Sequence, residues 1–487
     1  MKLKHLRVIL AAIFFMGITL LFLDFTGTLH SWLGWMAKIQ FLPAVLAANA
    51  VITAGLILLT VVFGRIYCSV ICPLGIMQDI ISWINGKLKK KNRFRFNYSP
   101  ERKWIRYGFL AIFIAALVLG VHSLTALLAP YSSYGRIASN LMAPIYQWGN
   151  NLLALLAERA DSYAFYRTEV WIKSLPTLIV SIVTFVVIFF MAWRGGRTYC
   201  NTVCPVGTIL GFFSRKSIFA PVIDTEKCHN CGLCGRQCKS SCIDMENHAI
   251  DYSRCVACMD CIEVCKGKAI SFRLRHGHTK ATDSGRRAFM MSAAMTSTAI
   301  AAKATEGKHM LTPSKGEADR YTRPVPAGAI SIKNFNDHCT ACQLCVSVCP
   351  NQVLRPSTSL MSMMQPEMHY DKGYCRPECT KCSEVCPAGA ILPVSIEEKS
   401  SIRIGHAVVN LDLCVVNTDN IKCGNCARHC PAGAIKLVRK NPEDKKSLRI
   451  PTVVEDRCIG CGACEHLCPS KPVSAIHIEG NEVHSII

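Results

Sequence analysis

Cysteine is the residue type with the most chemistry to offer in this sequence, which holds 29 cysteines in 487 residues. Most of them fall in evenly spaced runs of four. Residues 228–238 read CHNCGLCGRQC and residues 255–265 read CVACMDCIEVC, both with the spacing C-x₂-C-x₂-C-x₃-C. Two-cluster bacterial ferredoxins use this run to hold [4Fe-4S] clusters, and the fourth cysteine of each run binds the cluster of the other run. The two runs therefore predict two clusters in one small domain.

Four further runs follow in the second half of the chain. Residues 339–350 and 458–469 are regular, whereas 375–387 has one extra residue in its first gap and 414–431 has eight residues there. The enlarged gaps leave C-x₂-C-x₃-C-P intact, so the number of ligands is kept. Zinc is the alternative that C-x₂-C alone would allow, but full four-cysteine runs favour clusters. Crossed ligation gives six predicted sets: set A (Cys228, Cys231, Cys234, Cys265), set B (Cys255, Cys258, Cys261, Cys238), set C (Cys339, Cys342, Cys345, Cys386), set D (Cys375, Cys379, Cys382, Cys349), set E (Cys414, Cys423, Cys426, Cys468) and set F (Cys458, Cys461, Cys464, Cys430).

A different cysteine motif occurs twice in the first half. Residues 67–75 read YCSVICPLG and residues 199–207 read YCNTVCPVG. Each pair places two thiols one helical turn apart, and two pairs could supply the four thiolates of one iron–sulfur or thiolate–metal site. We call Cys68, Cys72, Cys200 and Cys204 the four-thiol site. Buried or redox-active thiols that hold no metal are the open alternative, because this spacing is not diagnostic. Cys242 belongs to no set.

Apolar segments that precede these motifs are long enough to cross a bilayer, which takes about 20 residues. We predict four spans, near residues 8–24, 43–63, 104–128 and 174–193. The first follows MKLKHLR without a small-x-small cleavage site, which favours a signal anchor over a cleaved signal. Residues 129–173 are read as a connecting loop.

The distribution of Lys and Arg predicts the orientation of these spans. Residues 64–106 hold ten basic side chains, against one in residues 25–42. Because basic loops stay in the cytoplasm, both ends of the four-span unit are expected there, and so is the segment 194–287.

The stretch SGRRAFMMSAAMTSTAIAAKA, residues 284–304, has the pattern of an export signal in the middle of the chain. An arginine pair (Arg286, Arg287) precedes a short apolar run that ends in small residues, as in twin-arginine signals. A fifth span and a cytoplasmic linker are the alternatives. Export would place the four-cluster half in the periplasm, and cleavage after Ala304 would release it.

The predicted fold class is a multidomain protein: an α-helical transmembrane bundle of four spans, with a fifth as an option, plus α+β ferredoxin-like domains that each hold two [4Fe-4S] clusters. The predicted domains are residues 1–215 (membrane), 216–275 (cytoplasmic ferredoxin), 276–325 (signal and linker) and 326–487 (four-cluster ferredoxin). Short β-like runs support small hairpins around the clusters. These runs are residues 329–335, 390–396, 406–413, 434–438, 450–456 and 475–479.

On these motifs the chain resembles two ferredoxin-type proteins joined end to end. Residues 1–270 are similar to the membrane polyferredoxins of the NapH and MauN type. Residues 284–487 are similar to the exported ferredoxins of the NapG and MauM type. The resemblance implies an inner-membrane, multi-pass electron carrier of anaerobic respiration, with a quinol dehydrogenase role.

Function follows from what the sequence contains and lacks. The sequence has no C-x-x-C-H haem motif, dinucleotide loop or P-loop. The formal charge of +22 falls to roughly +10 when six Cys₄ clusters at about −2 each are counted, so nucleic acid is not an expected partner. We expect electron transfer from quinol in the membrane to a periplasmic reductase or redox carrier. His30 and His122 are candidates for contact with quinol, and Asp24 for a proton path. Two alternatives are a metal-handling maturation factor for a respiratory oxidase or reductase, and a scaffold or redox sensor.

Overall fold

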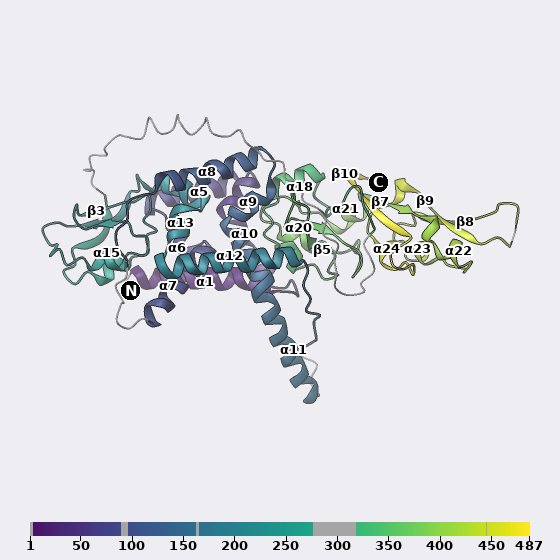
Figure 1. Ribbon diagram of the computed structural model, residues 1–487, viewed down its shortest axis with the longest axis horizontal. Coiled ribbons are helices and arrows are strands. Elements are labelled where there is room, and N and C mark those ends of the chain that lie inside the picture. Colours follow the sequence, from purple (N-terminus) through teal and green to yellow (C-terminus); the bar gives the residue numbers. More distant parts are fainter. Residues whose placement is uncertain (1–2, 89–95, 162–164, 276–317, 445) are drawn as a thin grey trace.

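The computed structural model describes residues 3–88, 96–161, 165–275, 318–444 and 446–487. Four long helices run along the longest axis in the middle of the molecule (Figure 1). They are α1 (Leu3–Leu23), α5 (Ala50–Phe63), α8 (Lys103–Val118) and α12 (Leu175–Gly195). Residues 219–275 lie at one end of this bundle and residues 318–487 at the other (Figure 1). The signal-like stretch 284–304 lies outside the described residues.

Two helices are long and apolar enough to cross a membrane, namely α1 and α12 with 21 residues each. The other two predicted spans are each divided in two. Residues 43–63 become α4 (Phe41–Leu46) and α5, because Ala48 takes a positive φ of 51° and Asn49 caps the second helix. Residues 104–128 become α8 and α9 (His122–Leu128), with a break at Gly120, whose φ is 69°. A four-span bundle therefore stays a prediction.

Further helices connect these four. They are α2 (His30–Leu33), α3 (Trp35–Lys38), α6 (Tyr67–Val70), α7 (Pro73–Leu88), α10 (Pro130–Ile137), the π-helical stretch η1 (Ala138–Met142), α11 (Ala143–Arg159), α13 (Thr198–Thr202) and α14 (Pro205–Ser214). The expected loop 129–173 thus contains helices, and every residue of α10 is buried. In Figure 1, α11 points away from the bundle.

Residues 219–275 form a small module of two antiparallel strand pairs and two short helices. Strand β1 (Phe219–Ile223) pairs with β4 (Ile270–Leu274), and β2 (Ile243–Asp244) pairs with β3 (Ala249–Ile250). The helices are α15 (Leu233–Gln237) and α16 (Asp260–Val264). The Phe219 ring lies 5.9 Å from Phe63 at the end of α5 and 6.4 Å from Phe272. This aromatic stack fixes the module to the bundle.

Residues 318–487 contain two hairpins and one further antiparallel strand pair, together with short helices. The pairs are β5 (Leu354–Pro356) with β6 (Pro366–Met368), β8 (Ile435–Arg439) with β9 (Arg449–Val453), and β7 (Ile402–Val409) with β10 (Ile476–Ile486). The helices are α18 (Ile332–His338), α19 (Leu344–Ser347), α20 (Lys381–Val385), α21 (Ile396–Ser401), η3 (Leu411–Leu413), α22 (Val415–Thr418), α23 (Asn425–Arg428), η4 (Glu455–Arg457) and α24 (Ala463–His466).

The last four predicted β-runs contain strands, whereas the first two do not. Residues 329–335 are mostly helix α18, because the Ser331 side chain accepts a hydrogen bond from the Asn334 amide and caps the helix. Residues 390–396 contain no strand and lead into α21. Local β-propensity was overridden at both places by capping serines.

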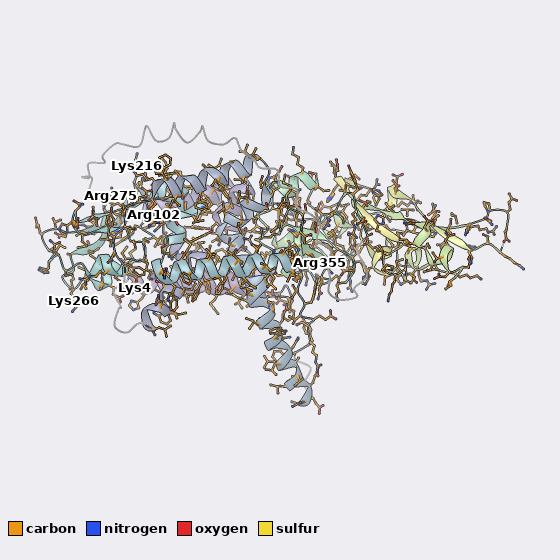
Figure 2. All side chains as sticks on the ribbon, in the orientation of Figure 1. Lys4, Arg102, Lys216, Lys266, Arg275 and Arg355 are labelled. Atoms are coloured by element: carbon orange, nitrogen blue, oxygen red, sulfur yellow. The ribbon has the colours of Figure 1, made fainter. Side chains whose placement is uncertain are left out.

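Basic side chains lie along the whole molecule, and Figure 2 labels several of them at one end. Figure 2 shows Lys4, Arg102, Lys216, Lys266 and Arg275 around the end that carries residues 219–275. An excess of Lys and Arg marks the cytoplasmic side of membrane proteins. The orientation predicted from the sequence would place this end in the cytoplasm.

Candidate functional site

The four regular cysteine runs share one backbone conformation. The second residue after the first cysteine has positive φ in every run, at Asn230, Ala257, Ala341 and Gly460. The fourth residue after it also does, at Gly232, Met259, Gln343 and Gly462. Positive φ is costly for residues other than glycine and persists only where the surroundings demand it. Two left-handed residues curl each loop, and the third cysteine then opens or enters a short helix.

The thiols of four predicted sets surround cavities. Those of sets B, C, D and E each line a small cavity of their own. Each cavity receives three cysteines from one run and the fourth from the other. In set F, Cys464 lies within electrostatic reach of Cys461, Cys458 and Cys430. In each of these five sets, the structure thus brings three cysteines of one run close to the fourth cysteine of the partner run.

Set A is brought together in part. Cys234 lies within electrostatic reach of Cys228 and Cys231. Cys265 packs in the same small core, and its sulfur accepts a hydrogen bond from the Ala269 amide at 3.2 Å. Within the described residues, no group of three or more His, Cys, Asp or Glu side chains is placed to hold a single metal ion.

Cys242, which belongs to no predicted set, lies beside set B. Its sulfur is 3.5 Å from that of Cys238 and also contacts Cys255. The residue is 1% exposed and lines the cavity of set B. Its spacing from Cys238, C-x₃-C, was the sequence signal for this fifth thiol.

The four-thiol site is assembled by two copies of one loop. Gly64 ends α5 with φ 74°, and Gly196 ends α12 with φ 62°. Each loop then makes one short turn of helix, α6 or α13, and enters the next helix at a Cys-Pro pair. All four thiols are at least 95% buried and within electrostatic reach of one another. The structure therefore brings the two predicted pairs together.

Two arginines cross between the loops, and the sequence analysis did not identify them. Arg65 Nη2 donates to the Cys200 carbonyl at 3.0 Å and lies 3.8 Å from Cys68 Sγ. Arg197 Nη1 donates to the Cys68 carbonyl at 2.8 Å and lies 3.8 Å from Cys200 Sγ. Each arginine thus contacts the thiol of its own loop and the backbone of the other. The signal was a Gly-Arg pair that precedes both motifs, at residues 64–65 and 196–197.

Glycines leave room for these arginines. A Cβ on Gly207 would lie 2.7 Å from Arg65 Nη2, and a Cβ on Gly75 would lie 2.5 Å from Arg197 Nη1. The carbonyl oxygens of Cys200 and Cys68 would lie even closer to these two Cβ atoms. The final glycine of the motif therefore leaves room for the first turn of its own loop as well as for the arginine of the other repeat.

Asp79 of α7 holds the second arginine in place. It accepts bonds from Arg197 Nε at 3.0 Å and Nη2 at 2.8 Å, and from Arg7 Nη1 at 3.1 Å. Lys239 Nζ lies 3.6 Å from Asp79 and 2.9 Å from Asp260. Burial raises the pKa of Asp79, but the charges of Arg197 and Lys239 outweigh it and hold that pKa well below its ordinary value. This network joins α1, α7, the second loop and the module 219–275.

The buried helix α10 lies between the bundle and set C. Gly135 packs against the Cys342 carbonyl. Tyr131, whose hydroxyl has no hydrogen-bond partner among the described residues, lies within electrostatic reach of Cys342 and Cys386. Arg136 Nη1 donates to the Ala126 carbonyl at 2.9 Å. Two polar side chains, Tyr131 and Arg136, thus lie near set C.

The candidate quinol residues lie where the bundle meets residues 318–487. His30 Nδ1 lies 3.3 Å from Asp24 Oδ2, and both side chains are more than 90% buried. Asp24 also accepts bonds from three backbone amides of its loop, so it shapes that loop. His122 Nε2 lies 3.5 Å from Asp337 of α18. Lys381 Nζ donates to the Thr26 carbonyl at 2.8 Å and ties set D to the same loop.

Two family models match the chain on these cysteine motifs. A model described as a 4Fe-4S binding domain matches residues 45–91 and 177–221, which contain the two halves of the four-thiol site. A model described as a 4Fe-4S dicluster domain matches residues 338–390 and 421–471.

Three named relatives each match part of the chain. Ferredoxin-type protein NapH of Haemophilus influenzae is 26% identical over 48% of this chain and 71% of its own length. Ferredoxin-type protein NapG of Escherichia coli is 32% identical over 29% of this chain and 64% of its own length. Methylamine utilization ferredoxin-type protein MauM of Methylobacillus flagellatus is 31% identical over 31% of this chain and 70% of its own length. The chain therefore belongs to the ferredoxin-type iron–sulfur proteins that include NapH, NapG and MauM, with NapH-like and NapG/MauM-like features in one polypeptide.

Proposed function

We propose that this iron–sulfur electron-transfer protein passes electrons from quinol in the inner membrane to a periplasmic acceptor, as a quinol dehydrogenase component. The acceptor would be a nitrate-reductase-like respiratory enzyme or the carrier that serves it. The proposal takes sets A to F as the ligands of six [4Fe-4S] clusters, each of which accepts and donates one electron.

The donor chemistry of the sets fits this cofactor. Each set supplies four thiols, and four sets surround a cavity lined mainly by apolar groups. Cations lie beside the thiols of set D: Lys399 Nζ donates to the Arg376 and Cys379 carbonyls and is electrostatically coupled to Cys375. Such a cation offsets the negative charge that thiolates carry.

The observation that carries the proposal is that sets C, D, F and E follow one another in a row that begins at the bundle. Cys345 of set C is within electrostatic reach of Cys382 of set D. The Cys375 amide of set D donates to the Cys461 carbonyl of set F at 2.9 Å. Two short helices then connect sets F and E. Helix α24 runs from Cys464 of set F towards Cys468 of set E, and α23 runs from Cys426 of set E towards Cys430 of set F. The order is C, D, F, E.

Quinol suits this row of sets as a donor. It is the mobile reductant of the bilayer, and its oxidation to quinone releases two electrons and two protons. The electrons would enter the row singly. Either buried histidine at the junction, His30 or His122, could accept a proton, since each already has a carboxylate partner.

A liposome experiment tests the donor. The full chain is reconstituted anaerobically, and menaquinol or ubiquinol is added, with and without partner proteins from the same membrane. Reduced clusters are then counted by EPR. We expect reduction of the clusters of residues 318–487. Clusters that all stay oxidised under every condition would contradict the quinol step.

A location experiment tests the two-sided arrangement. An epitope placed after Ile487 should be protease-accessible in spheroplasts. A variant with Arg286→Lys and Arg287→Lys should lose that exposure if the stretch 284–304 directs export. An inaccessible epitope in the unaltered sequence would put all sets in the cytoplasm and favour the maturation-factor alternative. Against that alternative stands the burial of the four-thiol site, which leaves a copper ion no direct access.

A further inference from the structure

The four-thiol site lies between the two groups of predicted clusters. On one side, Arg65 joins it to set B. Arg65 Nη1 donates to the Ser253 carbonyl at 3.0 Å, while its Nη2 lies 3.8 Å from Cys68 Sγ. Ser253 comes two residues before Cys255, which is itself within electrostatic reach of Arg65. One buried guanidinium therefore spans the gap between the four-thiol site and set B.

On the other side, two side chains lead to set C. Tyr199 precedes Cys200 and is within electrostatic reach of three of the four thiols. Arg136 of α10 is electrostatically coupled both to Tyr199 and to Cys342 of set C. All of these side chains are buried. The four-thiol site is thus linked by one or two side chains to a predicted cluster in each direction.

The positive charges around the four-thiol site favour a negatively charged group within it. Arg65 is fully buried, and no carboxylate lies within ion-pair distance of it among the described residues. The ion-pair network behind Arg197 contains one more cation than carboxylates: Lys4, Arg7, Arg197 and Lys239 against Asp79, Asp260 and Glu263. An unpaired buried charge is strongly unfavourable. Four neutral thiols would leave the buried charge of Arg65 without a negative partner, whereas four thiolates around an iron–sulfur cluster carry about −2.

Neither repeat can hold a cluster alone. Each match to the 4Fe-4S binding model contains only two cysteines of the site. The crossed arginines show that the two loops form one unit.

We propose that the four-thiol site holds a seventh iron–sulfur cluster, shared by the two repeats, which joins sets A and B to sets C to F in one electron path through the bundle. The proposal rests on the proposed function for its neighbours but not on quinol as donor. The chemistry supplied is the reversible uptake of one electron, without bond formation or proton transfer. Gln78 Nε2, which lies 3.3 Å from Cys200 Sγ, and the Gly207 amide, 3.3 Å from Cys204 Sγ, are the donors that would hold the thiolates.

The test is an iron count on the full chain, purified anaerobically in detergent. Six four-iron clusters account for about 24 iron atoms per chain, and a seventh raises the count to about 28. Iron and acid-labile sulfide are measured chemically, and Mössbauer spectra of ⁵⁷Fe-labelled protein give the cluster type. A fully loaded protein with no more than about 24 iron atoms would overturn the proposal, and this result needs no variant.

A double variant assigns the extra iron. Cys68→Ser with Cys200→Ser removes one thiol from each repeat and should lose about one seventh of the iron, with the EPR signals of the other clusters retained. Ser69→Ala, which changes a buried neighbour of Cys68 but no thiol, is the matched control and should lose none. Unchanged iron in the double variant, or zinc or copper at this site in place of iron, would overturn the proposal. Absence of quinol reduction with 28 iron atoms present would instead reject only the proposed donor.

Discussion

We expect Asp79→Asn to lower the stability of the protein strongly, although it hardly changes the shape of the side chain. Asparagine keeps the size and one acceptor oxygen of the side chain but removes its charge. Arg197, which is fully buried, would then face no carboxylate within the described network, and Lys239 would keep only Asp260.

The expected magnitude follows from the burial of this network. Removal of one partner from a buried ion pair costs about 3–5 kcal/mol, because the other charge stays uncompensated. For a unit of about 150–250 residues, 1 kcal/mol lowers the melting temperature by about 2–4 °C. We therefore expect Asp79→Asn to lower the melting temperature by about 6–20 °C.

The assay is thermal unfolding of the cluster-loaded protein in detergent, followed by circular dichroism. Glu158→Gln is the matched control, since Glu158 pairs with Arg167 at 2.6 Å but the two side chains are 41% and 58% exposed. Exposed pairs contribute about 0–1 kcal/mol. A shift for Asp79→Asn no larger than that of Glu158→Gln would refute the reasoning.

The pH dependence of this effect has a defined sign. The folded-state pKa of Asp79 lies below its ordinary value of 3.8, so the stability from its charge is fully present above about that pH and is lost only below it. The difference between Asp79→Asn and the unaltered protein should therefore be equal at pH 6 and pH 8.

Three further outcomes are expected. Gly207→Ala would force Arg65 away and should lower the melting temperature and the iron content, whereas Gly149→Ala, with open space around its Cβ, should do neither. Arg136→Gln removes a buried cation beside set C and should lower the reduction potential of that cluster in an EPR-monitored titration, where a tenfold change in the equilibrium is about 59 mV. Burial lowers the pKa of His484 to about 4, so protonation favours the unfolded state and the C-terminal half should lose stability as pH falls from about 6.5 towards 4. His484→Leu should remove this acid sensitivity, measured as the difference in melting temperature between pH 7 and pH 5.

Spacing alone was sufficient to predict which cysteines come together in sets B to F, but not the complete assembly of set A or the place of Cys242 beside set B. In a run of C-x₂-C-x₂-C-x₃-C, the first three thiols share one tight loop and the fourth follows a short helix that carries it away. The crossing of Cys349 into set D and of Cys430 into set F follows from that geometry. The two enlarged gaps did not disturb it, because the extra residues enter before the conserved spacing of the last three cysteines.

The surroundings of the four-thiol site could not be predicted in the same way. The Gly-Arg pairs at residues 64–65 and 196–197 were visible as a repeat, but sequence identity does not show that each guanidinium reaches the opposite loop. Helix α10 was missed for a different reason. Its sequence, PYSSYGRI, is polar and opens with proline, which is typical of a loop. It is helical and buried because the bundle and set C enclose it on both sides.

The crossed arginines also bear on how this protein is made. Each loop depends on a guanidinium supplied by the other, and 132 residues of chain separate them. During synthesis the first loop emerges with Arg65 and Gly75 in place but with no partner for either until residue 207 has followed. The first repeat must therefore remain half complete while the intervening helices are synthesised. A polypeptide with one such loop could complete this centre only by pairing with a second copy of itself, so the arrangement has the geometry of a homodimer interface contained within a single chain.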